Sequence, residues 1–413
     1  MGADNQDYTL LVDTISNRGV EIEPVKTAIK RLRIETPSWG YGNSGTRFQV
    51  FPFEGAAQTL YQKMEDAALV NRLTGACPSM AIHIPWDLVD DWDAVAAYAK
   101  KLGIAIGAVN PNLFQDEEYK FGSTCNPSAT IRKQAIERME ECIQIARKVG
   151  SHDLSLWLGD GTNYPGQDDI RARKKRLFET FSEVYTCMPD DMRLLIEYKF
   201  FEPSFYHTDL SDWGMAFVLA QKLGPKAQVL VDLGHHPQGT NIEHIVAFLI
   251  DEGKLGGIHF NDRKYADDDL MVASSNPFQL FLIFHEIISA HDEPACTHTV
   301  ENIAYMLDQS HNIEPKVEGI LQSVMNIQTA YAKALIVNRK ALKEAQRNTN
   351  VLSANRILDE AFQTDTRPLL AKIREEIGIG PDPIAVYRSS GHAERVARER
   401  GKAQLAGGYT GKT

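Results

Sequence analysis

Cysteine is scarce in this chain, and its placement excludes a disulfide framework. The five cysteines are spread far apart, their number is odd, and none forms a C-x-x-C pair: Cys77, Cys125, Cys142, Cys187 and Cys296. This pattern is typical of reduced thiols in a cytosolic protein and argues against a thiolate zinc site.

Long hydrophobic runs are also missing. The most apolar window, residues 278–290, contains His285 and Glu286 and is too short to cross a bilayer. The first fourteen residues are polar and acidic, without the basic start and apolar stretch of a secretory signal. We therefore expect a cytoplasmic protein that has no membrane partner.

Positive charge is in deficit. Lysine and arginine number 44 against 55 aspartates and glutamates, so the formal net charge is -11. Such a chain repels phosphate backbones at long range, and nucleic acid is not an expected partner. The surplus of carboxylates suits a protein that binds divalent cations.

Short β-branched runs alternate with amphipathic segments through the middle of the chain. Strands are predicted at residues 79–84, 104–109, 153–158, 193–198, 228–233, 257–260 and 299–307, each followed by a helical pattern. The spacing fits βαβ units, and the runs are apolar on both faces, as in a covered parallel sheet. An eighth strand is expected near residues 271–273, unless one connection is misread.

The fold class that we predict is α/β, a (β/α)8 TIM barrel with a helical C-terminal extension. Polar residues follow many successive strands, and a barrel brings those strand ends to one mouth, whereas an open sheet spreads them out. The predicted division is an N-terminal extension at 1–75, the barrel at 76–330, the helical extension at 331–405 and a disordered tail at 406–413.

Four polar side chains at strand ends predict a metal site. Each ends an apolar run, where a charge is costly unless it is paired or bound to a cation. They are Glu197, Asp232, His259 and Asp308. Three carboxylates beside one imidazole repel each other unless a metal compensates them, and oxygen-rich ligation favours Mn²⁺, Mg²⁺ or Co²⁺.

A second set of ligand types lies close in sequence. His235 is three residues past Asp232, and Asp267 and Asp269 point to the same side if their stretch is extended. With Glu197 as a bridge, this set can hold a second cation. Two cations can clamp adjacent substrate oxygens and acidify a bound water.

Further candidates face the same mouth and suit a sugar. Lys199 shares a strand side with Glu197, so its ammonium can stabilise a developing oxyanion. His83 ends the first predicted strand and can bond a hydroxyl or ring oxygen. Trp86 and Trp157 offer aromatic faces to sugar C–H surfaces.

Each of these residues also has a purely structural interpretation. A single aspartate after a strand is usually a helix cap, and the run 267–269 alone is typical of a solvated loop. Trp86 and Trp157 alone are typical of a core, and Lys199 can pair with Glu197. What favours a functional site is the coincidence of carboxylates and imidazole on strand ends that a barrel brings together.

At these residues the chain strongly resembles the broad-specificity bacterial L-rhamnose isomerases, within the xylose isomerase-like barrels. The matching motifs are Gly45-Thr-Arg-Phe48, His83-Ile-Pro-Trp-Asp87, Leu156-Trp-Leu-Gly-Asp-Gly161, Glu197-Tyr-Lys199, Asp232-Leu-Gly-His-His236, Tyr265-Ala-Asp-Asp-Asp-Leu270 and Leu307-Asp-Gln-Ser-His-Asn312. The resemblance implies interconversion of L-rhamnose and L-rhamnulose, and of other pairs such as allose and psicose.

The resemblance also implies two divalent ions in each subunit. Manganese is the preferred candidate, and Co²⁺, Mg²⁺ and Zn²⁺ are the alternatives. Glu197, Asp232, His259 and Asp308 would hold a structural ion, and Glu197, His235, Asp267 and Asp269 would surround a catalytic one. His83, Trp86, Trp157 and Lys199 would contact the monosaccharide. Phe48, in a substrate-site loop of the N-terminal extension, would reach a neighbouring subunit of a homotetramer.

The catalytic residues implied are Lys199, Asp308 and His83. An aldose-to-ketose conversion moves hydrogen from C2 to C1. The hydrogen moves either as hydride, helped by Lys199, or through an enediol with a carboxylate base such as Asp308. The sequence leaves both routes open.

Three other functions compete with this interpretation. A related sugar epimerase, or another xylose isomerase-like metalloenzyme, would share the ligand pattern. A DNA-repair endonuclease of a related barrel is disfavoured by the acidic charge and by the lack of a basic stripe. A non-catalytic sugar-binding protein would bind the monosaccharide without needing a metal for turnover.

Overall fold

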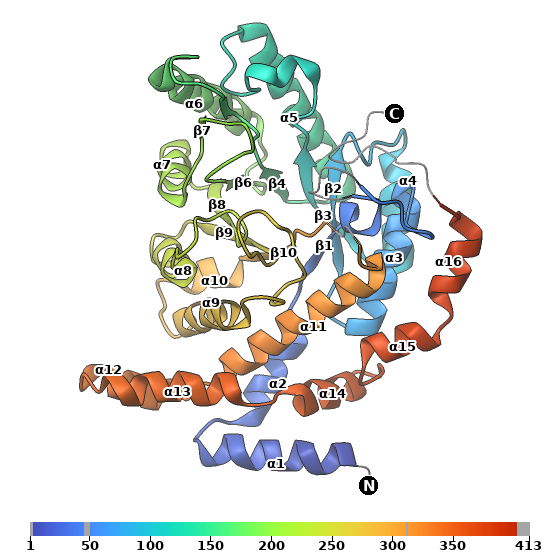
Figure 1. The fold of residues 1–413 in the computed structure, drawn as a ribbon, viewed down its shortest axis with the longest axis vertical. Coiled ribbons are helices and arrows are strands. Elements are labelled where there is room, and N and C mark those ends of the chain that lie inside the picture. The colour runs from blue at the N-terminus through green and yellow to red at the C-terminus, as the bar shows by residue number, and fades with distance from the viewer. Residues whose placement is uncertain (1–2, 45–49, 311–312, 403–413) are drawn as a thin grey trace.

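Eight parallel strands form the centre of the molecule. The computed structural model describes residues 3–44, 50–310 and 313–402, so Phe48 and the predicted tail at 406–413 lie outside the described residues. Within the described part, the strands close into a barrel in the order β1-β10-β9-β8-β6-β4-β3-β2, with helices around it (Figure 1). The predicted (β/α)8 barrel with C-terminal helices is confirmed.

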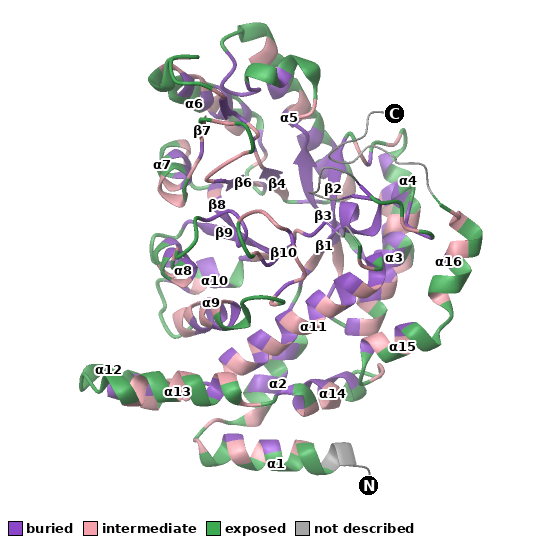
Figure 2. Ribbon diagram, in the orientation of Figure 1, coloured by how far each residue is buried: buried purple, intermediate pink, exposed green. Residues whose placement is uncertain are grey.

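The barrel strands are short and mostly buried, as Figure 2 shows by their purple colour. They are β1 (Glu35–Pro37), β2 (Ser79–Ile84), β3 (Ala105–Pro111), β4 (Asp153–Leu156), β6 (Arg193–Glu197), β8 (Ala227–Asp232), β9 (Leu255–Phe260) and β10 (Ala304–Leu307). Two further strands, β5 (Gly161–Thr162) and β7 (His207–Thr208), pair antiparallel with each other. Burial on both faces of the barrel strands explains their near-continuous apolar runs.

Helices cover the outside of the barrel and extend beyond it. Those that alternate with the strands are α3 (Leu60–Thr74), α4 (Trp92–Leu102), α5 (Ala129–Val149), α6 (Ile170–Cys187), α7 (Trp213–Leu223), α8 (Ile242–Asp251), α9 (Pro277–Ala290), α10 (Thr297–Glu301) and α11 (Lys316–Leu335). Several begin where an Asp or Asn side chain accepts a backbone N–H of the first turn, as Asp91 and Asp212 do.

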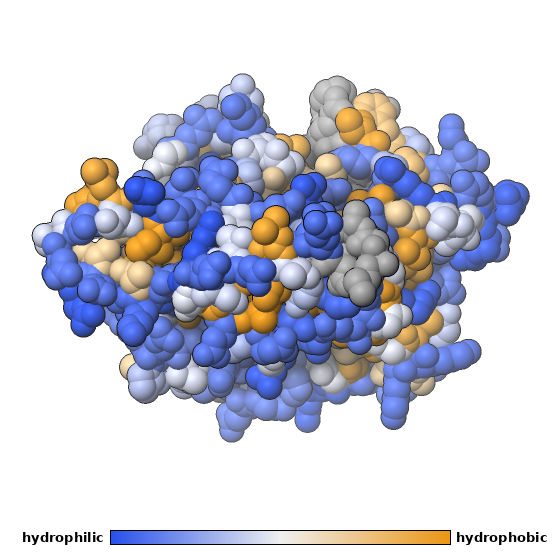
Figure 3. Space-filling view, turned by 90° about the horizontal axis from the view of Figure 1, so that it is seen from below, coloured by the Kyte–Doolittle hydropathy of each residue, from blue (hydrophilic) through white to orange (hydrophobic). Residues whose placement is uncertain are grey.

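The remaining helices come from both ends of the chain; most lie below the barrel, and the last two continue up its right-hand side (Figure 1). They are α1 (Ala3–Asn17), α2 (Ile22–Arg31), α12 (Arg339–Arg347), α13 (Val351–Gln363), α14 (Arg367–Glu376), α15 (Pro383–Ser389) and α16 (His392–Arg400). Two 3-10 turns lie within the barrel region, η1 (Ser38–Tyr41) between β1 and α3 and η2 (Glu117–Phe121) between β3 and α5. Seen from below, the surface is largely hydrophilic, with apolar side chains in small separate areas (Figure 3). Among the described helices, none has the length and apolar character needed to cross a membrane.

Two strand predictions are wrong. The eighth strand is not at residues 271–273, where Leu270 makes an isolated bridge with Asp262 and the φ angle of Ala273 is 56°. It is β1, which lies inside the segment 1–75 that we expected to precede the barrel, so the barrel includes part of that segment. The strand predicted at 299–307 is α10 followed by the shorter β10.

The glutamate that begins β1 is folded into the barrel interior. A Cβ on Gly107 would fall 1.2 Å from Glu35 Oε2, so only glycine leaves room for this carboxyl group. Glu35 Oε1 accepts a hydrogen bond from Ala108 N at 2.9 Å. Burial nevertheless raises the pKa of Glu35 to about 7.

We expect Glu35→Gln to stabilise the protein at alkaline pH. Because the pKa of Glu35 is raised in the folded state, the folded protein holds a proton that the unfolded chain releases, and stability falls as pH rises from about 4.5 through about 7. At about 1.4 kcal/mol per pKa unit, this loss approaches roughly 3 kcal/mol. Glutamine cannot ionise and keeps an acceptor for Ala108. Denaturant unfolding of both proteins at mildly acidic and at alkaline pH measures the effect, and equal pH slopes would contradict it.

Candidate active site

The predicted ligands gather at one end of the barrel because neighbouring strands deliver them. Glu197 is the last residue of β6 and Asp232 the last of β8, while His259 lies one residue before the end of β9. Asp308 follows β10 directly. The strands β6, β8, β9 and β10 are consecutive in the barrel, and their C-terminal ends therefore share one mouth.

The first set forms a tight cluster. One ligand atom from each of Glu197, Asp232, His259 and Asp308 lies within 4.8 Å of the others. His259 Nδ1 is 3.3 Å from Glu197 Oε2, 3.4 Å from Asp308 Oδ2 and 3.8 Å from Asp232 Oδ2. Glu197, Asp232 and His259 are buried, so the cluster has little help from water.

The chemistry of the first set fits a divalent cation. Among the described residues, Glu197 Oε1 and both ring nitrogens of His259 are buried without a hydrogen-bond partner. Burial, and then the charges of Glu197 and Asp308, raise the pKa of Asp232 to about 6 against the opposing charge of His235. A cation would satisfy the unpaired atoms and relieve the repulsion between carboxylates.

The second set shares the mouth but is less tightly grouped. His235 Nε2 is 2.9 Å from Asp267 Oδ1, and His235 Nδ1 is 3.1 Å from Glu197 Oε1. Asp267 and Asp269 line the same hollow as Glu197 and His235. In the described part of the chain, however, this set does not bring its ligand atoms as close as the first set does.

We had assumed an extended segment for Asp267 and Asp269, but the segment is not extended. The φ angles of these two residues are 50° and 46°, in the left-handed region that non-glycine residues seldom occupy. Burial, and then the charges of Asp267 and Asp308, hold the pKa of Asp269 well above its usual range. Strained backbone and mutually repelling carboxylates are both features that gather at functional sites.

The predicted sugar contacts line the same hollow. Its walls are Trp39, His83, Trp86, Asn110, Phe114, Trp157, Glu197, Lys199, His235, His259, Asp267, Asp269 and Asp308. The His83 ring stacks on Trp86 with 3.8 Å between centroids, and Phe114 meets Trp157 edge-on at 4.6 Å. Burial lowers the pKa of His83 to about 3, so its imidazole is neutral near pH 7.

Lys199 does not pair with Glu197, the alternative that the sequence left open. Its Nζ atom is 2.6 Å from Asp267 Oδ2 and 2.6 Å from Glu202 Oε2, and it lies 5.1 Å from the centroid of the Trp157 ring. Burial opposes the charge, but these two carboxylates raise the pKa of Lys199 overall. The mouth therefore contains a firmly charged ammonium beside the second set.

Two residues that hydrogen-bond to the predicted ligands were missed from the sequence. Trp39 Nε1 donates to Asp308 Oδ1 at 2.9 Å, and Asn261 Nδ2 donates to both Asp232 oxygens at 3.1 and 2.9 Å. Asn261 had a detectable signal, because it follows His259 by two residues at a strand end. Trp39 follows a strand of three residues, which gives no periodic pattern to recognise.

Comparison with known proteins finds a family that matches most of the barrel and relatives that match almost the whole chain. Residues 75–306 match the family described as Xylose isomerase-like TIM barrel. A protein named as a probable sugar isomerase from Rhizobium meliloti is 44% identical over 98% of this chain and 94% of its own length. Another protein with that name, from Mesorhizobium japonicum, is 41% identical over 96% of this chain and 92% of its own.

The barrel is also similar to solved structures at low identity. A crystal structure of a D-psicose 3-epimerase in the presence of D-fructose superposes with a TM-score of 0.51 and 13% identity, over 73% of this chain and 97% of that one. A structure of an L-ribulose 3-epimerase gives a TM-score of 0.50 and 16% identity, over 78% of this chain and 98% of the other. At such identity the likeness concerns the fold alone.

Proposed function

The chain belongs to the xylose isomerase-like TIM barrel family, and from that premise we propose that it is a metal-dependent sugar isomerase that interconverts an aldose and a ketose. The observation that carries the proposal is the cluster of Glu197, Asp232, His259 and Asp308 beside a hollow with aromatic walls and a charged lysine. The relatives named as probable sugar isomerases, which match almost the whole chain, support it.

The proposed cofactor is a pair of divalent ions. Manganese is the preferred candidate, and Co²⁺, Mg²⁺ and Zn²⁺ are the alternatives. Glu197, Asp232, His259 and Asp308 would hold one ion, and Glu197, His235, Asp267 and Asp269 the other. When bound, such ions polarise a carbonyl and lower the pKa of water. Two sets that share Glu197 would place both ions at the same mouth.

The side chains around the ligands have separate roles in this proposal. Neutral His83 offers one donor and one acceptor to the ring oxygen or a hydroxyl of the sugar. The rings of Trp86 and Trp157 pack on its C–H faces and exclude water. Lys199 donates to the oxygen on which negative charge develops, and Asp308 stands as the carboxylate base if a proton is abstracted.

The route of the hydrogen can be decided with a label. We expect an aldose deuterated at C2 to give a ketose that keeps the deuterium at C1, because a hydride shift moves the hydrogen directly between the two carbons while Lys199 stabilises the developing oxyanion. Mass spectrometry of the product after partial turnover in ordinary water measures retention. Complete loss of deuterium would instead favour an enediol with Asp308 as the base.

The proposed substrates are L-rhamnose and L-rhamnulose, with other pairs such as allose and psicose. A small panel of aldoses incubated with the protein and added Mn²⁺, with each product identified by chromatography, tests the proposal. Formation of a ketose supports it. Inversion at one carbon without any aldose–ketose conversion would identify a sugar epimerase, and binding without turnover a sugar-binding protein.

We also propose that the protein assembles as a homotetramer in which Phe48 reaches the site of a neighbouring subunit. This part rests on the resemblance of Gly45-Thr-Arg-Phe48 to the corresponding motif of the L-rhamnose isomerases. Light scattering on the purified protein measures the assembly, and a monomer with full turnover would contradict the role of Phe48.

A further inference from the structure

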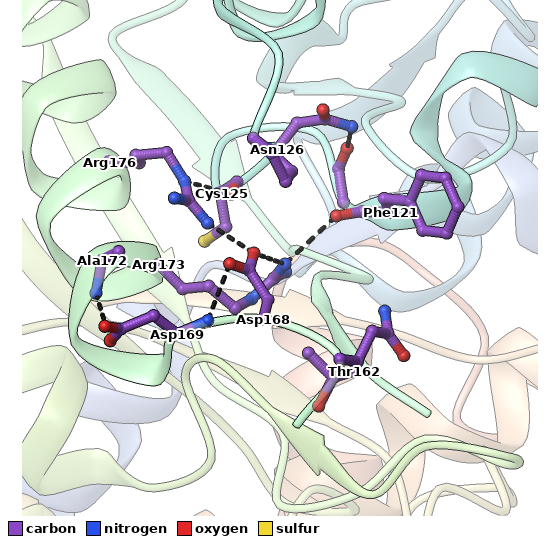
Figure 4. Close-up of polar contacts among 12 residues, drawn as sticks. Phe121, Cys125, Asn126, Thr162, Asp168, Asp169, Ala172, Arg173 and Arg176 are labelled. Carbon is purple, nitrogen blue, oxygen red and sulfur yellow. Dashed lines mark hydrogen bonds and ion pairs between the residues drawn. The ribbon is translucent and has the colours of Figure 1, made fainter. Parts of the chain in front are cut away.

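A buried arginine outside the ligand sets lies at the centre of a polar network (Figure 4). The side chain of Arg173, in α6, is 0% exposed. Its Nε and Nη2 donate to the carboxylate of Asp209 at 2.7–3.1 Å. Its Nη1 donates to Asp168 Oδ2 at 3.1 Å and to Phe121 O at 3.2 Å. Figure 4 also shows Arg176 reaching Asp168 and the carbonyl of Cys125.

This network does not need a metal ion, although three of its ligand-type atoms lie close together. Cys125, Asp160 and Asp209 offer atoms within 4.8 Å of one another. Asp160, however, accepts hydrogen bonds from the backbone of Ser123 and Cys125 and from two hydroxyls. Burial raises the pKa of the Cys125 thiol well above its usual range. The guanidinium of Arg173 already supplies the positive charge.

Asp209 connects this network to the candidate active site. It follows β7, and its backbone N donates to Asp160 O at 3.0 Å. The residues on either side of Asp209 hold the main chain of Lys199. Thr208 Oγ1 donates to Lys199 O at 2.6 Å, and Lys199 N donates to Leu210 O at 3.0 Å. Both main-chain hydrogen-bonding groups of Lys199 therefore depend on the segment that Arg173 clamps.

From these contacts we propose that Arg173, acting through Asp209, is a positioning residue for Lys199. The inference rests on the proposed function, in which the Lys199 ammonium faces a sugar oxygen. An arginine suits this task because its planar fork fixes a carboxylate in two directions, whereas a lysine would hold it at one point. A displacement of about 1 Å at a reacting group can cost on the order of a hundredfold in rate.

The first test compares two aspartates that lose the same charge. Asp209→Asn is expected to lower kcat by about tenfold or more with a smaller change in KM. Asp153→Asn is the matched control, because Asp153 also pairs bidentately with an arginine, Arg193, at 2.8 Å for both bonds, but at the N-terminal end of the barrel strands. We expect its kcat to stay within about twofold of the original. Equal losses of kcat in both variants would overturn the inference.

A second pair of variants removes the risk that an uncompensated Arg173 disturbs folding. Thr208→Val deletes the hydroxyl that binds Lys199 O and keeps the side-chain shape, while Thr208→Ser keeps the hydroxyl. We expect Thr208→Val to lower kcat and Thr208→Ser to retain it.

In a Lys199→Met background, Asp209→Asn should cause no additional loss of kcat, because the two changes act on the same group. Additive losses would mean that Arg173 has only a structural role.

Hydrogen–deuterium exchange separates this inference from the proposed function. The peptide that contains Lys199 should exchange faster in Asp209→Asn and in Thr208→Val than in the unaltered protein, whether or not a sugar is turned over. Unchanged exchange there would overturn the inference. If the unaltered protein converts no aldose, the proposed function fails, and the exchange result still decides whether Arg173 positions Lys199.

Discussion

We expect Asp267→Asn to lower isomerase turnover by on the order of 10³-fold while the barrel remains folded. Asp267 lies between the two groups that the proposed chemistry needs most. Its Oδ1 is 2.9 Å from His235 Nε2, and its Oδ2 is 2.6 Å from Lys199 Nζ. Asparagine is nearly isosteric but carries no charge, so it would weaken cation binding and remove one of the two counter-charges of the ammonium. Steady-state kinetics with saturating Mn²⁺ measures the loss.

The next residue along the chain supplies the control. Asp268 belongs to the same acidic run, but its Oδ2 accepts hydrogen bonds from the backbone of Lys264 and Tyr265 and it does not line the hollow. Asp268→Asn loses the same charge and keeps an acceptor, so turnover should stay within about twofold, as for most surface substitutions. Similar melting temperatures in both variants would show that Asp267→Asn acts on chemistry. Normal turnover in Asp267→Asn would exclude its ligand role.

The fold could be predicted largely because strand–helix alternation leaves a strong local pattern. The range of β2 was predicted to the residue, and a helical pattern was expected after each predicted strand, since buried strands and amphipathic helices have different hydrophobic periods. The first barrel strand was not, because three residues ending in Pro37 are too few to show a period. The segment 299–303 contains the β-branched pair Thr299 and Val300 but forms mostly helix, since packing outweighs local propensity.

The candidate site was easier to predict in composition than in geometry. Charged residues at the ends of apolar runs identify Glu197, Asp232 and His259, since burial there has a cost that only a partner offsets. The pairing of Lys199 with Asp267 could not be predicted, because Asp267 lies 68 residues away and only the barrel brings the two together. The proposed role of Arg173 could not be predicted from the sequence either, because its contacts with Asp209 and Phe121 join segments that are far apart in the chain.

Removing the metal is expected to lower turnover at least as strongly as Asp267→Asn does. Dialysis against a chelator should reduce turnover by on the order of 10³-fold or more, and added Mn²⁺ should restore it, because the proposed chemistry draws its carbonyl polarisation from the cation. Mn²⁺ should also raise the melting temperature, since a ligand at about 100 times its Kd stabilises the folded state by about 2.7 kcal/mol. Full turnover in protein shown to be metal-free by elemental analysis would contradict the proposed function.

Glu197 is the residue on which this metal dependence should converge, because it is the one member common to both ligand sets. Its Oε2 is 3.3 Å from His259 and its Oε1 is 3.1 Å from His235. Glu197→Gln should therefore abolish the Mn²⁺-dependent rise in melting temperature together with turnover. Glu202→Gln removes a carboxylate that contacts Lys199 but belongs to neither set, so the rise should persist. A Glu197→Gln protein that Mn²⁺ still stabilises as strongly would place the cation elsewhere.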